Sequence, residues 1–146
     1  MTPIDPTVED DAVERPRPSR PALVELAAAM LIVGGVVGLL QVAAASSGVP
    51  AGAEAFRAGA VALDAGSIAL GLLVRTGRAW LVALNYAAVL GFLDLLGAGA
   101  SPFALMLGLA DILIVGILLA TRPWFDATRS WRAGVAGPRR GRRVSP

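Results

Sequence analysis

Three aspartates lie inside long apolar segments of the chain and are the first candidates for chemistry. Asp64, Asp94 and Asp111 each belong to a different segment. An ionised aspartate at the centre of a membrane-spanning helix costs about 2.5–3.5 kcal/mol, so each side chain should face other helices or a water-filled cavity. Two hypotheses follow. Together the carboxylates would bind a cation or relay a proton; alternatively, each is protonated or hydrogen-bonded and holds helices together.

Two further polar residues extend this candidate intramembrane site. Ser67 follows Asp64 at a spacing that places both on one helical face, together with small residues. Asn85 and Asp94 are separated by nine positions, so at ~100° per residue they point about 180° apart. We therefore expect Asn85 to meet another neighbour, as an interhelical hydrogen-bond donor or at a second protomer. The candidate site is Asp64, Asp94, Asp111, Ser67 and Asn85.

The composition excludes many kinds of site and places the chain in a membrane. The 146 residues include no histidine and no cysteine. Cysteine nucleophiles, disulfides, Cys/His zinc sites, His-ligated haem and Ser-His-Asp triads are therefore excluded. We expect no enzyme activity, no cofactor and no metal site.

Only 16% of the residues are charged and 55% are hydrophobic, whereas a soluble domain has about 25% charged residues. This composition is typical of an integral membrane protein.

Four apolar segments have the length of membrane spans, at about residues 22–45, 57–74, 79–97 and 103–121. The first covers roughly 36 Å as a helix, enough to cross a ~30 Å hydrocarbon layer, and exceeds the apolar core of a signal peptide. Gly77 and the pair Ser101-Pro102 are suited to helix ends. The predicted fold is an all-α, membrane-embedded four-helix bundle over residues 21–122.

Small residues predict how the first span packs. Gly34 and Gly38 have the four-residue spacing that permits close helix contacts, and Gln41 continues the same stripe. We expect this stripe to pack within the bundle, although the same motif also dimerises helices. In both cases a neighbouring helix packs directly against the backbone of the two glycines, which have no side chain.

A weak internal similarity relates the two halves of the bundle. The segment 38–41 resembles 91–94 at an offset of 53, and Asp64 corresponds to Asp111 at an offset of 47. The first and third spans run in the same direction. The similarity therefore predicts two helical hairpins related as parallel repeats about an axis along the membrane normal.

The distribution of arginine predicts the orientation. Twelve of the thirteen arginines lie in the N-terminal tail, the turn between the second and third spans, or the C-terminal tail; only Arg57 is on the other side. The positive-inside rule then places both termini in the cytoplasm and the protein in the inner (plasma) membrane. Trp80, Trp124 and Trp131 fall on the same face, where tryptophan suits the lipid interface.

The two tails have different compositions. Residues 1–20 are rich in acidic residues and proline, which predicts a disordered cytoplasmic tail. Residues 123–146 begin with an amphipathic segment that predicts a short interfacial helix. The polybasic end should bind anionic lipids, at about 1 kcal/mol per arginine. Without interleaved aromatic residues it does not indicate nucleic-acid binding. Its arginines are Arg139, Arg140, Arg142 and Arg143.

Two segments carry a family resemblance. The sequences Leu-Gly-Leu-Leu-Val-Arg-Thr-Gly-Arg-Ala-Trp at 70–80 and Leu-Leu-Ala-Thr-Arg-Pro-Trp-Phe at 118–125 resemble small uncharacterised four-helix bacterial membrane proteins over about residues 20–125. The chain is also similar to DoxX-like proteins, in which an acidic residue of the second helix precedes a Gly-Leu and arginine turn, as Asp64, Gly71-Leu72 and Arg75 do here. This second resemblance implies association with a membrane redox complex.

These observations lead to three hypotheses for function. The first is a structural or accessory component of the membrane, working as a homo-oligomer or with a membrane partner protein. The second is a small oligomeric proton or cation transporter or channel that uses the aspartates. The third is a DoxX-like subunit of a membrane redox complex.

Overall fold

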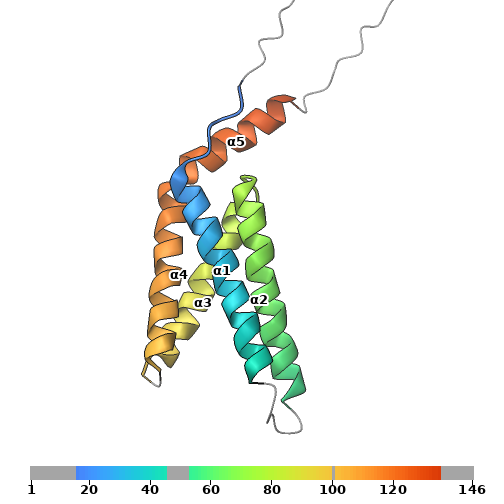
Figure 1. Cartoon of the computed structure of the whole chain (residues 1–146). Coiled ribbons are helices and arrows are strands. Elements are labelled where there is room, and N and C mark those ends of the chain that lie inside the picture. Colours follow the sequence, from blue (N-terminus) through green and yellow to red (C-terminus); the bar gives the residue numbers. More distant parts are fainter. Residues whose placement is uncertain (1–15, 46–52, 100, 136–146) are drawn as a thin grey trace, which may run out of the picture.

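The computed structural model describes residues 16–45, 53–99 and 101–135, and these residues form five helices and no strand (Figure 1). Four of the helices, with 18 to 23 residues each, are long and apolar enough to cross a membrane. The predicted all-α four-helix bundle is confirmed, and the chain is a multi-pass membrane protein. The helices are α1 (Ala22–Ala44), α2 (Glu54–Arg75), α3 (Trp80–Gly97), α4 (Pro102–Ala120) and α5 (Arg122–Val135).

The helix boundaries agree with the sequence prediction except at the start of α2. This helix begins at Glu54, three residues before the predicted start, because no helix-breaking residue stands between Glu54 and Arg57 and an acidic side chain suits the positive end of the helix dipole. The predicted start of α4 is confirmed. Pro102 is the first helical residue, and the side chain of Ser101 accepts a hydrogen bond from the Phe103 amide at 3.2 Å.

The turn between α2 and α3 depends on Gly77. Its φ of 75° lies in the left-handed region, where a side chain is strained. The Gly77 amide donates to the carbonyl oxygen of Val74 at 2.9 Å, and the Arg78 amide donates to that of Leu73 at 3.0 Å. This pair of bonds is a Schellman motif and satisfies two carbonyl groups at the end of α2. The predicted C-terminal cap is confirmed.

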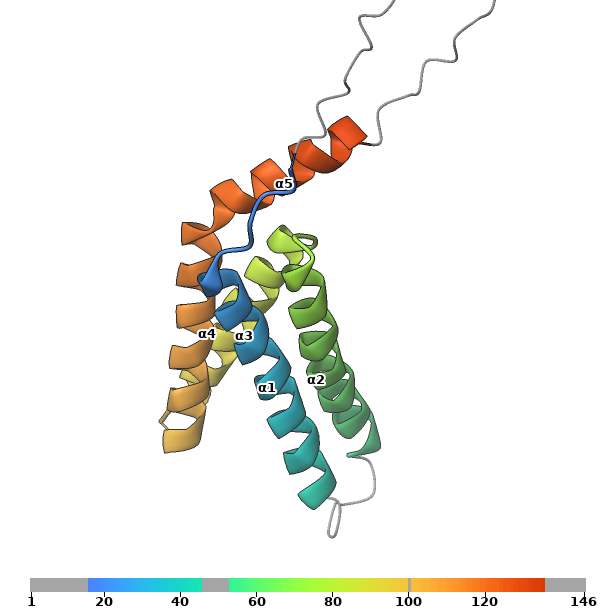
Figure 2. The same cartoon turned by 45° about the horizontal axis from the view of Figure 1, so that its top comes forward.

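The bundle consists of two antiparallel hairpins, α1–α2 and α3–α4. The helices within each hairpin pack closely, while the hairpins meet mainly through α1 and α4. Figures 1 and 2 show that the hairpins converge near α5 and diverge toward the opposite end. The hairpins are therefore close together at the end near α5, which we call the closed end, and farther apart at the opposite end.

Glycines set the distance between α1 and α2. A Cβ atom on Gly35 would overlap the carbonyl oxygen of Asp64, and one on Gly71 would lie 2.8 Å from the carbonyl oxygen of Ala28. Gly34, in contrast, has open space at its α-carbon. The expected close approach therefore exists, but Gly35 makes it instead of Gly34, because the side of α1 that faces α2 is rotated by one residue from the predicted stripe.

The second hairpin repeats this arrangement. A Cβ atom on Gly91 of α3 would lie 2.9 Å from the Cβ atom of Asp111 on α4. In the first hairpin, Gly38 of α1 faces the carboxyl group of Asp64 on α2 in the same way. These are the residues that the internal similarity pairs with each other. The contacts therefore support the description of the hairpins as two repeats.

The closed end of the bundle holds a small core. Helix α5 begins directly after α4 and extends across the ends of the other helices (Figures 1 and 2). Many of the large apolar side chains elsewhere on the helices are exposed, as expected for a surface that lipid covers. The core includes Val24, Ala27, Ala28, Leu31, Val74, Ala83, Ala87, Ile114, Leu118 and Phe125.

The apolar face of α5 packs on protein instead of lipid. Trp124 is only 8% exposed, and its ring centroid lies 4.9 Å from that of Phe125. The indole nitrogen of Trp80 donates to the carbonyl oxygen of Leu118 at 2.8 Å. The amphipathic helix lies where the sequence predicts it. The expected lipid-interface position is corrected for Trp124, which is buried, whereas Trp80 and Trp131 are half-buried.

The predictions for the two tails concern residues that the structure mostly does not describe. Residues 1–15 and 136–146 lie outside the described part of the chain. The predicted disordered tail and the polybasic segment with Arg139, Arg140, Arg142 and Arg143 therefore stay predictions.

Two neighbouring glycines provide a test of the α1–α2 packing. We expect Gly35→Ala to destabilise the protein by about 1–3 kcal/mol, since its methyl group would overlap backbone that cannot move easily. Gly34→Ala, one residue away, should leave stability unchanged. Unfolding in mixed micelles followed by circular dichroism measures both. Equal stability of the two variants would contradict the packing described.

Candidate intramembrane site

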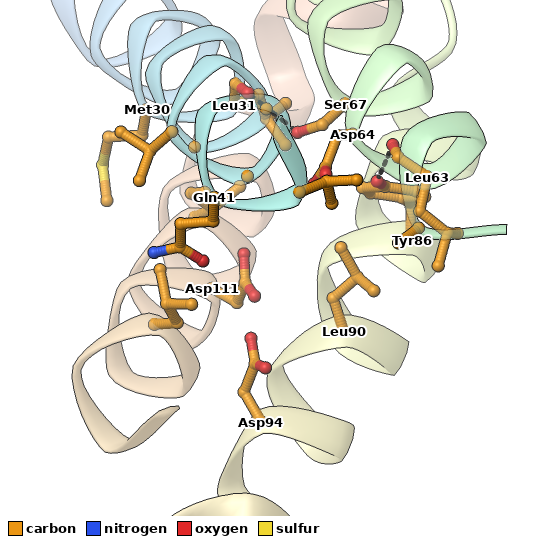
Figure 3. A pocket seen from close by; sticks show the side chains of 18 of the residues that line it. Met30, Leu31, Gln41, Leu63, Asp64, Ser67, Tyr86, Leu90, Asp94 and Asp111 are labelled. Atoms are coloured by element: carbon orange, nitrogen blue, oxygen red, sulfur yellow. Dashed lines mark hydrogen bonds between the residues drawn. The ribbon is translucent and has the colours of Figure 1, made fainter. Parts of the chain in front are cut away.

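A cavity of about 430 Å³ lies between the hairpins, in the part of the bundle away from α5 (Figure 3). All four spanning helices line it, and most of its lining side chains are apolar. This combination of an apolar wall and a few polar groups is typical of sites for small ligands. The polar side chains of the lining are Gln41, Asp64, Ser67, Tyr86, Asp94 and Asp111.

Asp64 occupies space that a glycine of the neighbouring helix leaves open. A Cβ atom on Gly38 would overlap the carboxyl group of Asp64, so this carboxyl group lies directly against α1. Gln41 follows Gly38 on the same helix and also lines the cavity, as does Gly34. The predicted stripe of Gly34, Gly38 and Gln41 therefore borders the cavity, and Gly38 makes room for the carboxylate.

Asp94 and Asp111 form a pair on the second hairpin. Figure 3 shows the carboxyl group of Asp94 on α3 pointing toward that of Asp111 on α4. The negative charges of the Asp94 and Asp111 carboxylates repel each other when both groups are ionised. A proton or a cation between them would remove this repulsion.

The two hydroxyl groups of the lining are bound to backbone. Ser67 donates to the carbonyl oxygen of Leu31 at 2.8 Å, which joins α2 to α1. Tyr86 donates to the carbonyl oxygen of Leu63 at 2.5 Å, which joins α3 to α2 (Figure 3). Since each hydroxyl has only one proton to donate, neither one donates to an aspartate.

The aspartates have no partner within the described part of the chain. No hydrogen bond or ion pair to Asp64, Asp94 or Asp111 occurs among residues 16–45, 53–99 and 101–135. Arg57 does not line the cavity. The hypothesis that the aspartates join helices through hydrogen bonds therefore gains no support. Carboxyl groups without partners in an apolar wall call for water, a proton or a cation.

Asn85 does not line this cavity. Its side chain is exposed and donates to the carbonyl oxygen of Leu81, in its own helix, at 2.7 Å. It borders a second hollow of about 500 Å³ between α2 and α3, and this hollow shares Leu63, Tyr86 and Leu90 with the first cavity. The predicted separation of Asn85 from Asp94 agrees with this position. The expectation of an interhelical hydrogen bond is wrong for the described residues, because the amide reaches its own backbone.

The spacing of the carboxylates does not suit a chelated metal ion. Within the described ranges, no three Asp, Glu, His or Cys side chains are close enough together to hold one.

Gln41 is the cavity residue whose part in the site the sequence analysis did not anticipate. It was assigned to helix packing, yet it lines the cavity from α1. The internal similarity contained the necessary signal, because Gln41 corresponds to Asp94 at the offset of 53. Tyr86 joins the site through its position one helical turn before Leu90, another lining residue.

No known protein family matches the chain, and no curated protein or solved structure matches it.

Proposed function

We propose that this chain is a small, non-enzymatic proton or cation transporter or channel unit of the plasma membrane. The observation that carries the proposal is that three carboxyl groups, from three helices, line one cavity without any described partner. A structural membrane component would have no need for three carboxyl groups within its spans, each of which costs free energy in a membrane.

The shape of the bundle supports access from one side. The core near α5 fills the end where the hairpins converge, and the cavity is lined by residues toward the end where they diverge. The arginine distribution supports a cytoplasmic position for the closed end. The cavity would then open to the outside and attract cations through its carboxylates.

The arrangement of the hairpins suggests how access could change. Asp64 belongs to the first hairpin, whereas Asp94 and Asp111 belong to the second. The hairpins meet mainly along α1 and α4, so a rocking motion between them would change fewer contacts than a motion within one hairpin. Neutralisation of the carboxylates by a proton or cation would favour their approach. Rocking of two repeats around a central site is a general route to alternating access.

Neutral variants of the three aspartates test the proposal. We expect Asp64→Asn, Asp94→Asn and Asp111→Asn each to reduce proton or cation flux in liposomes to the level of protein-free vesicles, because asparagine keeps the size of the side chain and removes its charge. A pH-sensitive dye inside the vesicles reports proton flux, and radioactive sodium or rubidium reports cation flux.

The matched control is Asp126→Asn, which makes the same change on α5, outside the cavity. This variant should retain the flux of the unmodified protein. Flux that persists in all three cavity variants would refute the proposal, as would an equal loss in the control.

The outward face of α2 favours a second, accessory role. Gly59 and Gly66 have open space where a Cβ atom would be, and both lie on the same side of the helix. Small residues of this kind let a second transmembrane helix approach closely. The partner would be another copy of the chain or a different membrane protein, such as a redox complex of the kind that the DoxX resemblance implies. The face also includes Ala55, Ala58, Ala62, Ala65 and Ala69.

Bulky substitutions on this face test the accessory role. Gly59→Ile and Gly66→Ile should dissociate the complex extracted in a mild detergent, because the partner helix can no longer approach. Leu119→Ile, on the exposed side of α4, is the control and should change nothing. Light scattering coupled to size exclusion measures the mass. A monomer in the unmodified protein would rule out assembly through this face.

A further inference from the structure

Helix α5 packs on the turn between α2 and α3 because Gly77 has no side chain. A Cβ atom at this position would lie 2.9 Å from the methyl carbon of Thr128 and 3.1 Å from a guanidinium nitrogen of Arg132. The guanidinium group of Arg132 also donates to the carbonyl oxygen of Thr76. Arg132 is therefore fixed against the turn, and the next residue of this turn after Gly77 is Arg78.

A third arginine reaches the same place from the N-terminal segment. The guanidinium carbon of Arg17 lies 6.0 Å from the centre of the Trp131 ring, next to Arg132 on α5. Desolvation lowers the pKa of Arg132, and the positive charges of Arg78 and Arg17 lower this pKa further. Three separate segments thus bring the guanidinium groups of Arg17 and Arg78 within electrostatic range of that of Arg132. We refer to Arg17, Arg78 and Arg132 as the arginine cluster.

The acidic side chains near this end of the described structure are paired with other arginines. Glu25 pairs with Arg20 and, at 2.9 Å, with Arg75. Asp126 lies 3.6 Å from Arg122 and 4.0 Å from Arg129.

Within residues 16–45, 53–99 and 101–135, no carboxylate forms an ion pair with the arginine cluster. Like charges held together without a counter-charge repel each other, and a bound anion would relieve this repulsion. The cluster therefore has an excess of positive charge that its described surroundings do not balance.

The position of the cluster indicates which anion fits. The turn with Arg78 follows the end of α2, and α5 begins just after α4 ends, so the cluster lies where two membrane spans end. Guanidinium groups bind phosphate oxygens through paired hydrogen bonds. We propose that the arginine cluster binds a phosphate group at the membrane boundary, supplied by an anionic phospholipid or by free phosphate. This site is independent of the aspartate cavity.

Binding by the full-length protein tests the proposal. One arm places the protein in nanodiscs of phosphatidylcholine with a minor fraction of phosphatidic acid, and native mass spectrometry counts the phosphatidic acid molecules that stay bound. A second arm titrates sodium phosphate into protein in a neutral detergent, against sodium chloride of equal ionic strength, and measures heat. The variants are Arg17→Gln, Arg78→Gln and Arg132→Gln.

Arg129→Gln is the matched control, since it removes the same charge from the same helix at a position outside the cluster. We expect cluster variants to weaken binding about tenfold, as the loss of a charge-assisted hydrogen bond implies. The control should retain the affinity of the unmodified protein. If Arg132→Gln releases α5 from the turn, Arg78→Gln still tests the site, because no hydrogen bond of the Arg78 side chain occurs in the described structure.

The two arms separate the two sources of phosphate. Retention of phosphatidic acid without heat from free phosphate supports a lipid headgroup site. Heat from free phosphate that the cluster variants abolish supports a soluble phosphate site. The proposal is overturned if neither probe binds, or if Arg129→Gln weakens binding as much as the cluster variants do, since the effect would then come from the overall charge.

Discussion

The high cost of a charged group inside a membrane is the constraint on which the arrangement of this protein depends. Asp64 and Asp111 cannot face lipid, and each is accommodated against a glycine of the neighbouring helix, Gly38 and Gly91 respectively. The same missing side chains bring the two backbones of each hairpin close together. The two glycines therefore account both for the close packing of the helices and for the placement of the aspartates, in each of the two repeats.

The two ends of the bundle have opposite properties. Near α5 the hairpins converge on a core of small and branched side chains, and arginines surround this core. At the other end the hairpins diverge around the cavity that holds the carboxylates. A site with access from one side corresponds to one of the two states of a transporter. The limited contact between the hairpins would permit a change to the other state, in which access is from the opposite side.

The sequence predicted the elements well and their mutual orientation poorly. Helix spans and caps depend on local composition, so the cap at Gly77 and the start at Pro102 were predictable. The rotation of each helix depends on packing with distant residues. A shift by one residue therefore made Gly35 the contact with α2, instead of Gly34. The burial of Trp124 likewise depends on a turn far away in the sequence, which the amphipathic pattern alone could not reveal.

The proposed function requires the aspartates to share a water-accessible cavity on the side opposite the termini. The chain has no native cysteine, so single variants Asp94→Cys and Ser67→Cys can be treated in sealed, oriented vesicles with a membrane-impermeant maleimide. Ala83→Cys, in the closed core, is the control. We predict labelling of both cavity positions only from the side opposite the termini. Labelling from the side of the termini, or from neither side, would contradict the claim.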